Sequence, residues 1–109
     1  MSDSPLESPY SVDVEDVAID DITRVCSSVA DTYGIMAGLA YRQKLKETAV
    51  QLGSIPGTGN TDSVRGKLVR YTPNHDRMYN LWFTVDDAAR IVTVHCIWAR
   101  GNRPPGSRF

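Results

Sequence analysis

The chain has 109 residues, of which 41% are hydrophobic and 23% charged, as expected of one soluble globular domain. No apolar run approaches the roughly 20 residues that a membrane span needs, and the polar, acidic start of the chain is unlike a secretory signal. We therefore expect a cytoplasmic protein without membrane contacts. Its two cysteines, Cys26 and Cys96, are too few for a disulfide framework or a zinc site, so we expect both to be buried structural thiols.

The charge is divided unevenly along the chain. Residues 1–41 hold eight acidic residues and one basic residue, which gives −7, whereas residues 42–109 hold eleven basic and five acidic residues, which gives +6. The sum is the overall net charge of −1. A basic second half predicts a surface for an anionic partner.

The first half of the chain reads as a short strand followed by two helices. Residues 1–9 are expected to be a flexible leader, and the alternating residues Tyr10–Val14 a half-buried strand. A helix is predicted over Asp16–Tyr33, with one apolar stripe formed by Ala18, Ile22, Val25, Val29 and Tyr33. Acidic residues crowd its first turns, where we expect them to cap free N–H groups: Glu15, Asp16, Asp20 and Asp21.

A second helix is predicted over Ile35–Leu52, between a stop at Gly34 and a cap at Gly53. Its inward residues are expected to be Leu45, Ala49 and Leu52. Because the break between the helices is so short, they should pair as an antiparallel hairpin.

The second half of the chain reads as strands. After a loop over Ser54–Asp62, three strands are predicted, with turns at Thr72–Asp76 and Asp86–Ala89: Val64–Tyr71, Met78–Val85 and Arg90–Ala99. The middle of the three should place Tyr79, Leu81, Phe83 and Val85 on one face and Trp82 on the other. The last strand is apolar on both faces, which is typical of a central strand. The tail, residues 101–109, contains Pro104 and Pro105 and cannot continue the sheet.

The order β-α-α-β-β-β resembles the RelE/ParE superfamily of bacterial type II toxins, and the resemblance covers residues 10–103. Four stretches are similar to family patterns: Tyr10–Ile22, Leu52–Gly59, Tyr79–Asp86 and Val94–Arg103. The resemblance implies an α+β fold in which a helical hairpin packs on a small antiparallel sheet. It also implies a division of the chain into three parts: a flexible leader at 1–9, a toxin domain at 10–103 and a C-terminal tail at 104–109.

The resemblance implies a growth-inhibiting toxin of a toxin–antitoxin system, a type of system that includes plasmid stabilisation modules. It also implies a cognate antitoxin with a disordered, acidic C-terminal segment, through which alone operator DNA would be contacted. Two mechanisms occur in the family. ParE-like toxins inhibit DNA gyrase by binding, whereas RelE-like toxins are ribosome-dependent mRNA interferases that cut mRNA.

Basic residues are the candidates for the target- or antitoxin-binding surface. Arg65 and Lys67 match the RelE-type lysine pair, and Arg103 matches the arginine after the last strand. With their neighbours, the predicted binding set is Arg65, Lys67, Arg70, Arg100, Arg103 and Arg108. Two positions depart from the RelE pattern: Asn80 replaces a strand arginine, and Phe109 replaces the tail tyrosine. Phenylalanine has no ionisable oxygen and cannot take a proton from a ribose hydroxyl.

If the chain is a nuclease, its catalytic residues are expected to be Lys67, His95 and Arg103. His75 and His95 supply its only imidazoles. We expect His75 to be a solvated turn residue, and His95 a core or half-buried residue more readily than a catalytic base. Trp82 and Trp98 are expected to be core or groove-wall residues, with base stacking as the alternative. No metal-ligand spacing or cofactor motif is present, so neither a metal nor a cofactor is expected.

The long first helix and the missing tail tyrosine favour the hypothesis of a ParE-like toxin, in which the protein is not an enzyme. The RelE-like nuclease is the alternative. A non-toxic binding module on the same fold is the third possibility.

Overall fold

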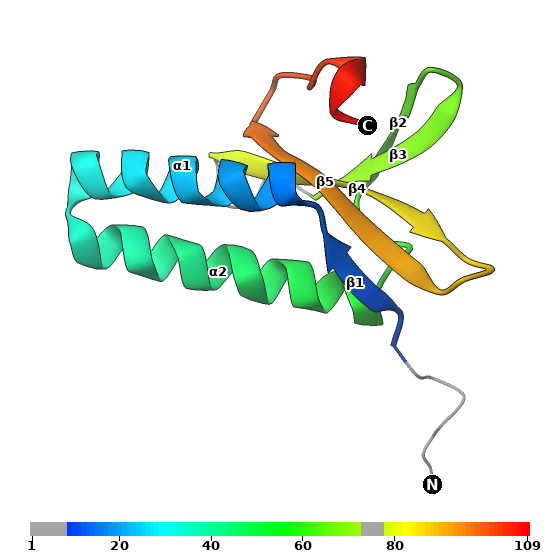
Figure 1. The fold of residues 1–109 in the computed structure, drawn as a ribbon, viewed down its shortest axis with the longest axis horizontal. Helices are drawn as coiled ribbons and strands as arrows, with labels where there is room; N and C mark the ends of the chain where they lie inside the picture. Colours follow the sequence, from blue (N-terminus) through cyan, green and yellow to red (C-terminus); the bar gives the residue numbers. More distant parts are fainter. Residues whose placement is uncertain (1–8, 73–77) are drawn as a thin grey trace, which may run out of the picture.

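The computed structural model describes residues 9–72 and 78–109, so the predicted leader (except Pro9), His75 and most of the predicted turn at Thr72–Asp76 lie outside the described residues. Figure 1 shows the arrangement of the elements. They are, in order, β1 (Ser11–Val14), α1 (Asp16–Tyr33), α2 (Ile35–Ser54), β2 (Asn60–Val64), β3 (Lys67–Tyr71), β4 (Tyr79–Asp86), β5 (Ile91–Ala99) and a short C-terminal 3₁₀ turn, η2 (Gly106–Arg108).

One mixed sheet contains the five strands in the order β1-β5-β4-β3-β2. The pairs β3–β4 and β4–β5 are antiparallel, as predicted. The pair β2–β3, which was not predicted, is antiparallel as well, and β1 runs parallel to β5. The α+β fold with a helical hairpin on a sheet is thus confirmed. The sheet is wider than expected and is not purely antiparallel.

Both helices pack on one face of the sheet and form the main core with it. The predicted apolar residues meet there, including Ala18, Val25 and Leu45, each at most 6% exposed, against Leu81 and Phe83 of β4. The expectation for Tyr33 was wrong, because that side chain is 70% exposed. The helical hairpin extends beyond the sheet (Figure 1), so the last turn of α1 has no strand beneath it.

Gly34 separates the helices as predicted, with φ of +101°. Gly53 does not cap α2, which was the expectation, but lies inside its last turn, and Ile55 follows the helix as its cap. The role of Gly53 is close approach: a Cβ at this position would lie 2.5 Å from the carbonyl oxygen of Tyr10. The Tyr10 N–H in turn donates to the Gly53 carbonyl at 2.8 Å, which ties the chain before β1 to the end of α2.

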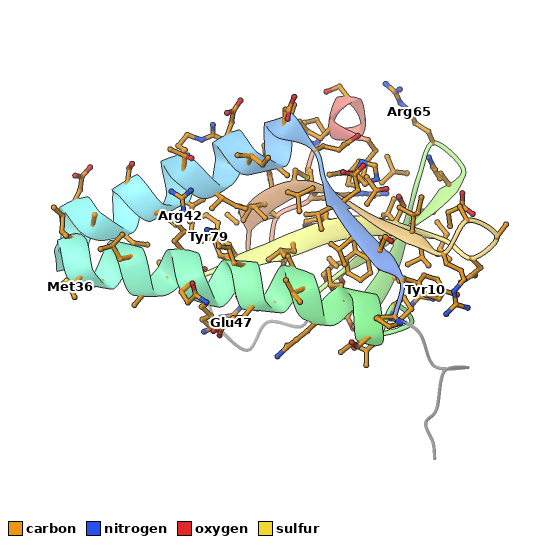
Figure 2. The ribbon with its side chains drawn as sticks, turned by 60° about the horizontal axis from the view of Figure 1, so that its bottom comes forward. Tyr10, Met36, Arg42, Glu47, Arg65 and Tyr79 are labelled. Carbon is orange, nitrogen blue, oxygen red and sulfur yellow. The ribbon has the colours of Figure 1, made fainter. Side chains whose placement is uncertain are left out.

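The expectation of a single loop over Ser54–Asp62 was wrong at its end, because β2 begins at Asn60. The predicted strand Val64–Tyr71 instead contains the last residue of β2, a turn, and β3, which pair as a β2–β3 hairpin. Its two-residue turn is Arg65-Gly66, where φ is +54° and +75°. Positive φ at both central residues matches the right-handed twist of the paired strands. Figure 2 shows Arg65 at this tip and Met36 at the opposite end of the molecule, on the helical hairpin.

No helix among the described residues is both long enough and apolar enough to cross a membrane.

Candidate functional site

The face of the sheet turned away from the helices, here called the outer face, carries a second, smaller core. Its buried members are Val64, Val69, Trp82 and Cys96, and its partly buried members are Tyr71, Trp98 and Phe109. Trp82 is only 3% exposed, and its ring stacks on Tyr71 with centroids 4.4 Å apart. The prediction of a core or groove-wall role for Trp82 and Trp98 agrees with this packing.

The C-terminal tail folds back over the outer face. The ring of Phe109 meets Trp82 edge-on, with centroids 6.0 Å apart, and lies 5.4 Å from the ring of His95. The guanidinium of Arg108 lies over the ring of Trp98, 5.2 Å from its centroid. The tail does not continue the sheet, as expected, but it forms part of the structure rather than an open arm.

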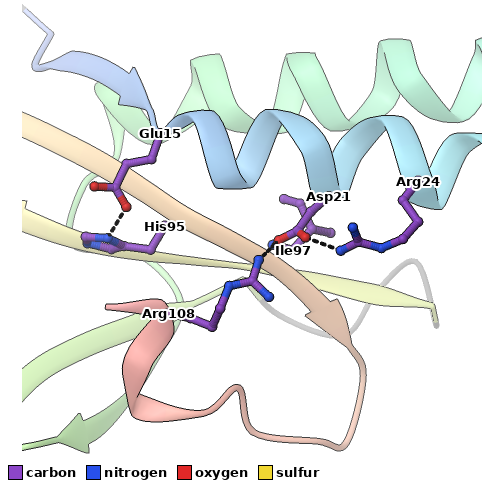
Figure 3. A network of polar contacts seen from close by, with 6 residues as sticks. All are labelled: Glu15, Asp21, Arg24, His95, Ile97 and Arg108. Atoms are coloured by element: carbon purple, nitrogen blue, oxygen red, sulfur yellow. Dashed lines mark hydrogen bonds and ion pairs between the residues drawn. The ribbon is translucent and has the colours of Figure 1, made fainter.

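His95 occupies a β-bulge. Trp82 pairs with Cys96 and Phe83 pairs with Val94, so His95 is the extra residue between them. Its Nε2 lies 2.7 Å from the hydroxyl of Thr84, and its Nδ1 lies 2.8 Å from a carboxylate oxygen of Glu15, as Figure 3 shows for the second contact. The His95 side chain is 7% exposed, and both ring nitrogens have partners.

Glu15 was expected to cap α1, but it makes no side-chain capping hydrogen bond and turns to His95 instead. Asp21 was also expected near free helical N–H groups. It is 1% exposed and accepts the backbone N–H of Ile97 at 3.1 Å, beyond the point where β1 stops pairing with β5. Arg24 and Arg108 both pair with its carboxylate (Figure 3). Asp21 thus joins α1, the edge of β5 and the tail.

Three of the predicted binding residues lie close to the β2–β3 hairpin. Arg65 is in its turn, next to Gly106 of the tail, and Lys67 shares a strand face with Val69. Arg103 donates to the carbonyl oxygen of Ser63, and its Nε lies 3.3 Å from a carboxylate oxygen of Asp62. All three are exposed.

The other three are placed elsewhere. Arg70 pairs with Phe83 of the helix-side core and donates to the carbonyl of Gly57 at 3.1 Å, so it points away from the outer face. Arg100 is exposed just after β5. The Arg108 side chain is 18% exposed and engaged with Asp21. The structure therefore brings together Arg65, Lys67 and Arg103, and separates Arg70 and Arg108 from them.

Both cysteines are buried, as expected. Burial raises the pKa of the Cys96 thiol to about 12 and raises the pKa of Cys26 as well. Neither thiol is therefore a ready nucleophile near neutral pH. Among residues 9–72 and 78–109, no three His, Cys, Asp or Glu side chains gather where they could hold a metal ion.

Sequence reasoning missed the contacts of Glu15, Asp21 and Thr84, all of which lie within the network around β5. The acidic start of α1 was a signal, but an acid there also suits helix capping. What decides these contacts is that α1 lies beside β5 in the fold. The two elements are far apart in sequence: Asp21 and Ile97, for example, are separated by 76 residues.

No protein-family model and no curated relative matches the chain. Solved structures do match. The chromosomal ParDE toxin–antitoxin system from P. aeruginosa contains a chain that superposes with a TM-score of 0.72 at 17% identity, over 84% of this chain and 97% of that one.

Two RelE structures superpose less closely. A double arginine-to-alanine mutant of the E. coli toxin RelE in the free state has a TM-score of 0.58 at 19% identity, over 85% of each chain. The toxin–antitoxin complex RelBE2 from Mycobacterium tuberculosis has a TM-score of 0.57 at 18% identity, over 84% of this chain and 99% of that one. The protein therefore has the RelE/ParE toxin fold.

Proposed function

We propose that the protein is the toxin of a type II toxin–antitoxin pair, that it acts in the cytoplasm by binding its target, and that this target is DNA gyrase, as in ParE-like toxins. The fold supports a toxin, since the similar structures are ParDE and RelE proteins. The hairpin of 18 and 20 residues supports the ParE-like form.

The observation that carries this proposal is the state of His95. General base catalysis needs an imidazole nitrogen within reach of the substrate proton. Glu15 and Thr84 hold both ring nitrogens of His95, and the Phe109 ring lies against it. Inhibition by binding needs no such base, so this arrangement favours an inhibitor over an enzyme.

The same proposal gives the antitoxin a place to bind. Its disordered, acidic C-terminal segment would fold onto the exposed bases of the outer face, Arg65 and Lys67, and onto Arg103, which would exchange its pair with Asp62 for a carboxylate of that segment. Charge attraction would speed this encounter. Operator DNA would be bound by the antitoxin and not by this chain.

A RelE-like mRNA endoribonuclease is the second candidate. It is favoured by one observation: Lys67, His95 and Arg103 all belong to the outer face or its rim. In that case Lys67 and Arg103 would stabilise the charge that develops at the scissile phosphate. A harmless binding module on the same fold is the third candidate.

Controlled expression in bacteria separates the three candidates. Gyrase inhibition predicts growth arrest with a DNA-damage response, loss of supercoiling by purified gyrase, and intact transcripts by primer extension. Cuts within translated codons would instead identify the nuclease, and unaffected growth the harmless module.

A matched pair of variants tests the surface. Lys67→Ala with Arg103→Ala removes two exposed bases of the outer face, whereas Lys44→Ala with Lys46→Ala removes two exposed bases of α2. We expect the first pair alone to lose binding of a neutralising acidic antitoxin segment. Equal losses in both pairs would mean that net charge, and not this surface, is recognised.

A further inference from the structure

A small hollow of about 200 Å³ opens on the outer face beside the segment that follows β5. Its walls come from β2, β3, β4 and that segment: Asp62, Tyr71, Asn80, Trp82, Gly101, Asn102 and Arg103. The hollow is smaller than the roughly 300–1,000 Å³ of sites for drug-sized ligands. It has room for one side chain or one small planar group.

Two residues that line this hollow, Asn80 and Trp82, each carry a buried polar atom without a hydrogen-bond partner among the described residues. These atoms are the side-chain oxygen Oδ1 of Asn80 and the indole Nε1–H of Trp82, in residues that are 2% and 3% exposed. Asn80 and Trp82 are two positions apart on β4, so both side chains project from the same face. Unpaired polar atoms this deeply buried are rare and costly, and here one acceptor and one donor belong to two residues that line the same hollow.

The rim of the hollow is electrically balanced. The carboxylate of Asp62 lies 3.3 Å from Nε of Arg103, so the negative and positive charges at the rim pair with each other. A phosphate or a free carboxylate would have to compete with Asp62 for Arg103. The rim therefore favours an uncharged ligand group.

The aromatic surfaces beside the hollow are already occupied. Trp82 stacks on Tyr71 at an interplanar angle of 23°, and Phe109 meets it edge-on. A nucleobase is recognised in single strands largely by stacking between such rings. With these ring contacts in place, the hollow offers hydrogen-bonding groups more than stacking faces.

We propose that this hollow is a subsite for one carboxamide group, the side chain of an Asn or Gln residue of a protein partner. The carboxamide oxygen accepts the Nε1–H of Trp82, and its NH₂ donates to Oδ1 of Asn80. One group thereby satisfies both buried atoms without adding charge. That the partner is the antitoxin rests on the proposed function, whereas the subsite itself does not.

Propionamide, which ends in the same group as a Gln side chain, is the probe for this subsite. In ¹⁵N-labelled protein the two tryptophans give two indole N–H signals, which Trp98→Phe assigns. Such a small ligand binds weakly, so the titration extends to concentrations on the order of 100 mM. We expect a saturable shift of the Trp82 indole signal, and a much smaller shift or none for propionate, which has the same shape but is charged.

The variant Asn80→Leu removes the acceptor at nearly constant volume. We expect it to remain folded with a raised Tm, and to bind propionamide at least tenfold more weakly. Asn60→Ala, at an exposed position of β2 outside the hollow, should bind as the unmodified protein does.

Three results would overturn the proposal. A Trp82 signal that no probe shifts would mean that the hollow holds only water. Equal shifts by propionate would remove the preference for an uncharged group, and a shift by uridine but not by propionamide would assign the hollow to a nucleobase. None of these outcomes depends on toxicity, so the subsite and the toxin function can fail separately.

Discussion

Replacing Arg108 by methionine tests whether the tail stabilises the fold through Asp21. The variant keeps an unbranched apolar stem but removes the guanidinium from the carboxylate of Asp21, a residue that is 1% exposed. Breaking a buried ion pair from one side costs about 3–5 kcal/mol. Arg24 and the Ile97 N–H remain on Asp21, so we expect a smaller loss of about 2–3 kcal/mol in the free energy of unfolding. In a domain of this size that lowers Tm by roughly 10–20 °C.

Urea denaturation followed by circular dichroism measures this loss, with Arg24→Met as the matched control. The Arg24 side chain is 66% exposed, so its pair with Asp21 should contribute less than about 1 kcal/mol. In an Asp21→Asn background, Arg108→Met should cost much less than it does alone, because the two groups are coupled. The reasoning fails if Arg108→Met is no worse than Arg24→Met, or if its cost is the same in both backgrounds.

Three more predictions follow from local geometry. Gly53→Ala should lose about 1–3 kcal/mol of stability, because its Cβ would lie 2.5 Å from the carbonyl oxygen of Tyr10, whereas Gly57→Ala, with nothing within 4 Å, should be nearly neutral in the same urea assay. Burial raises the pKa of the Cys96 thiol from 9.0 to about 12, so the stability that this thiol contributes is complete below pH 9 and is lost as pH rises toward 12. The Cys96 thiol should also resist Ellman's reagent at pH 8, and rapid reaction of the native protein would contradict this prediction. Asn80→Leu should gain about 1–2 kcal/mol, since it removes a buried acceptor without a partner among the described residues, and a loss measured by calorimetry would show that this acceptor is satisfied.

The elements with a strong apolar period were predictable. The apolar stripe of α1 and the inward residues of α2 predicted the bounds of both helices to within about two residues. Tyr33 continues the stripe past the end of the sheet and is therefore exposed. The alternation in Tyr79–Asp86 also assigned both faces of β4 correctly, since Phe83 and Trp82 lie in the two different cores. In these segments local pattern and tertiary burial agree.

The strand β2 could not be found in this way. Its sequence, Asn-Thr-Asp-Ser-Val, is polar, and only Val64 is buried. The turn that follows places Arg65 at positive φ, a conformation that asparagine or glycine usually signals. Without an apolar alternation or a typical turn sequence, nothing local distinguishes this strand from the loop before it.

The candidate surface was predictable in composition but not in geometry. Arg70 lies three positions after Lys67 on the same strand, so the two side chains point to opposite faces, which the two-residue period already implied. The engagement of Arg108 by Asp21 was beyond such reasoning, because the two are 87 residues apart. Charge counts identify the bases, whereas the topology decides which of them remain accessible.

The parallel pairing of β1 with β5 has a consequence for synthesis on the ribosome. Ser11 pairs with Ile91 and Val14 with Val94, so β1 cannot pair with β5 until residues 91–94 have emerged from the ribosome. Until then the helical hairpin can form locally, but its apolar side has no completed sheet to cover it. Nascent chains should therefore depend on late closure, or on a helper that shields this side, to avoid aggregation.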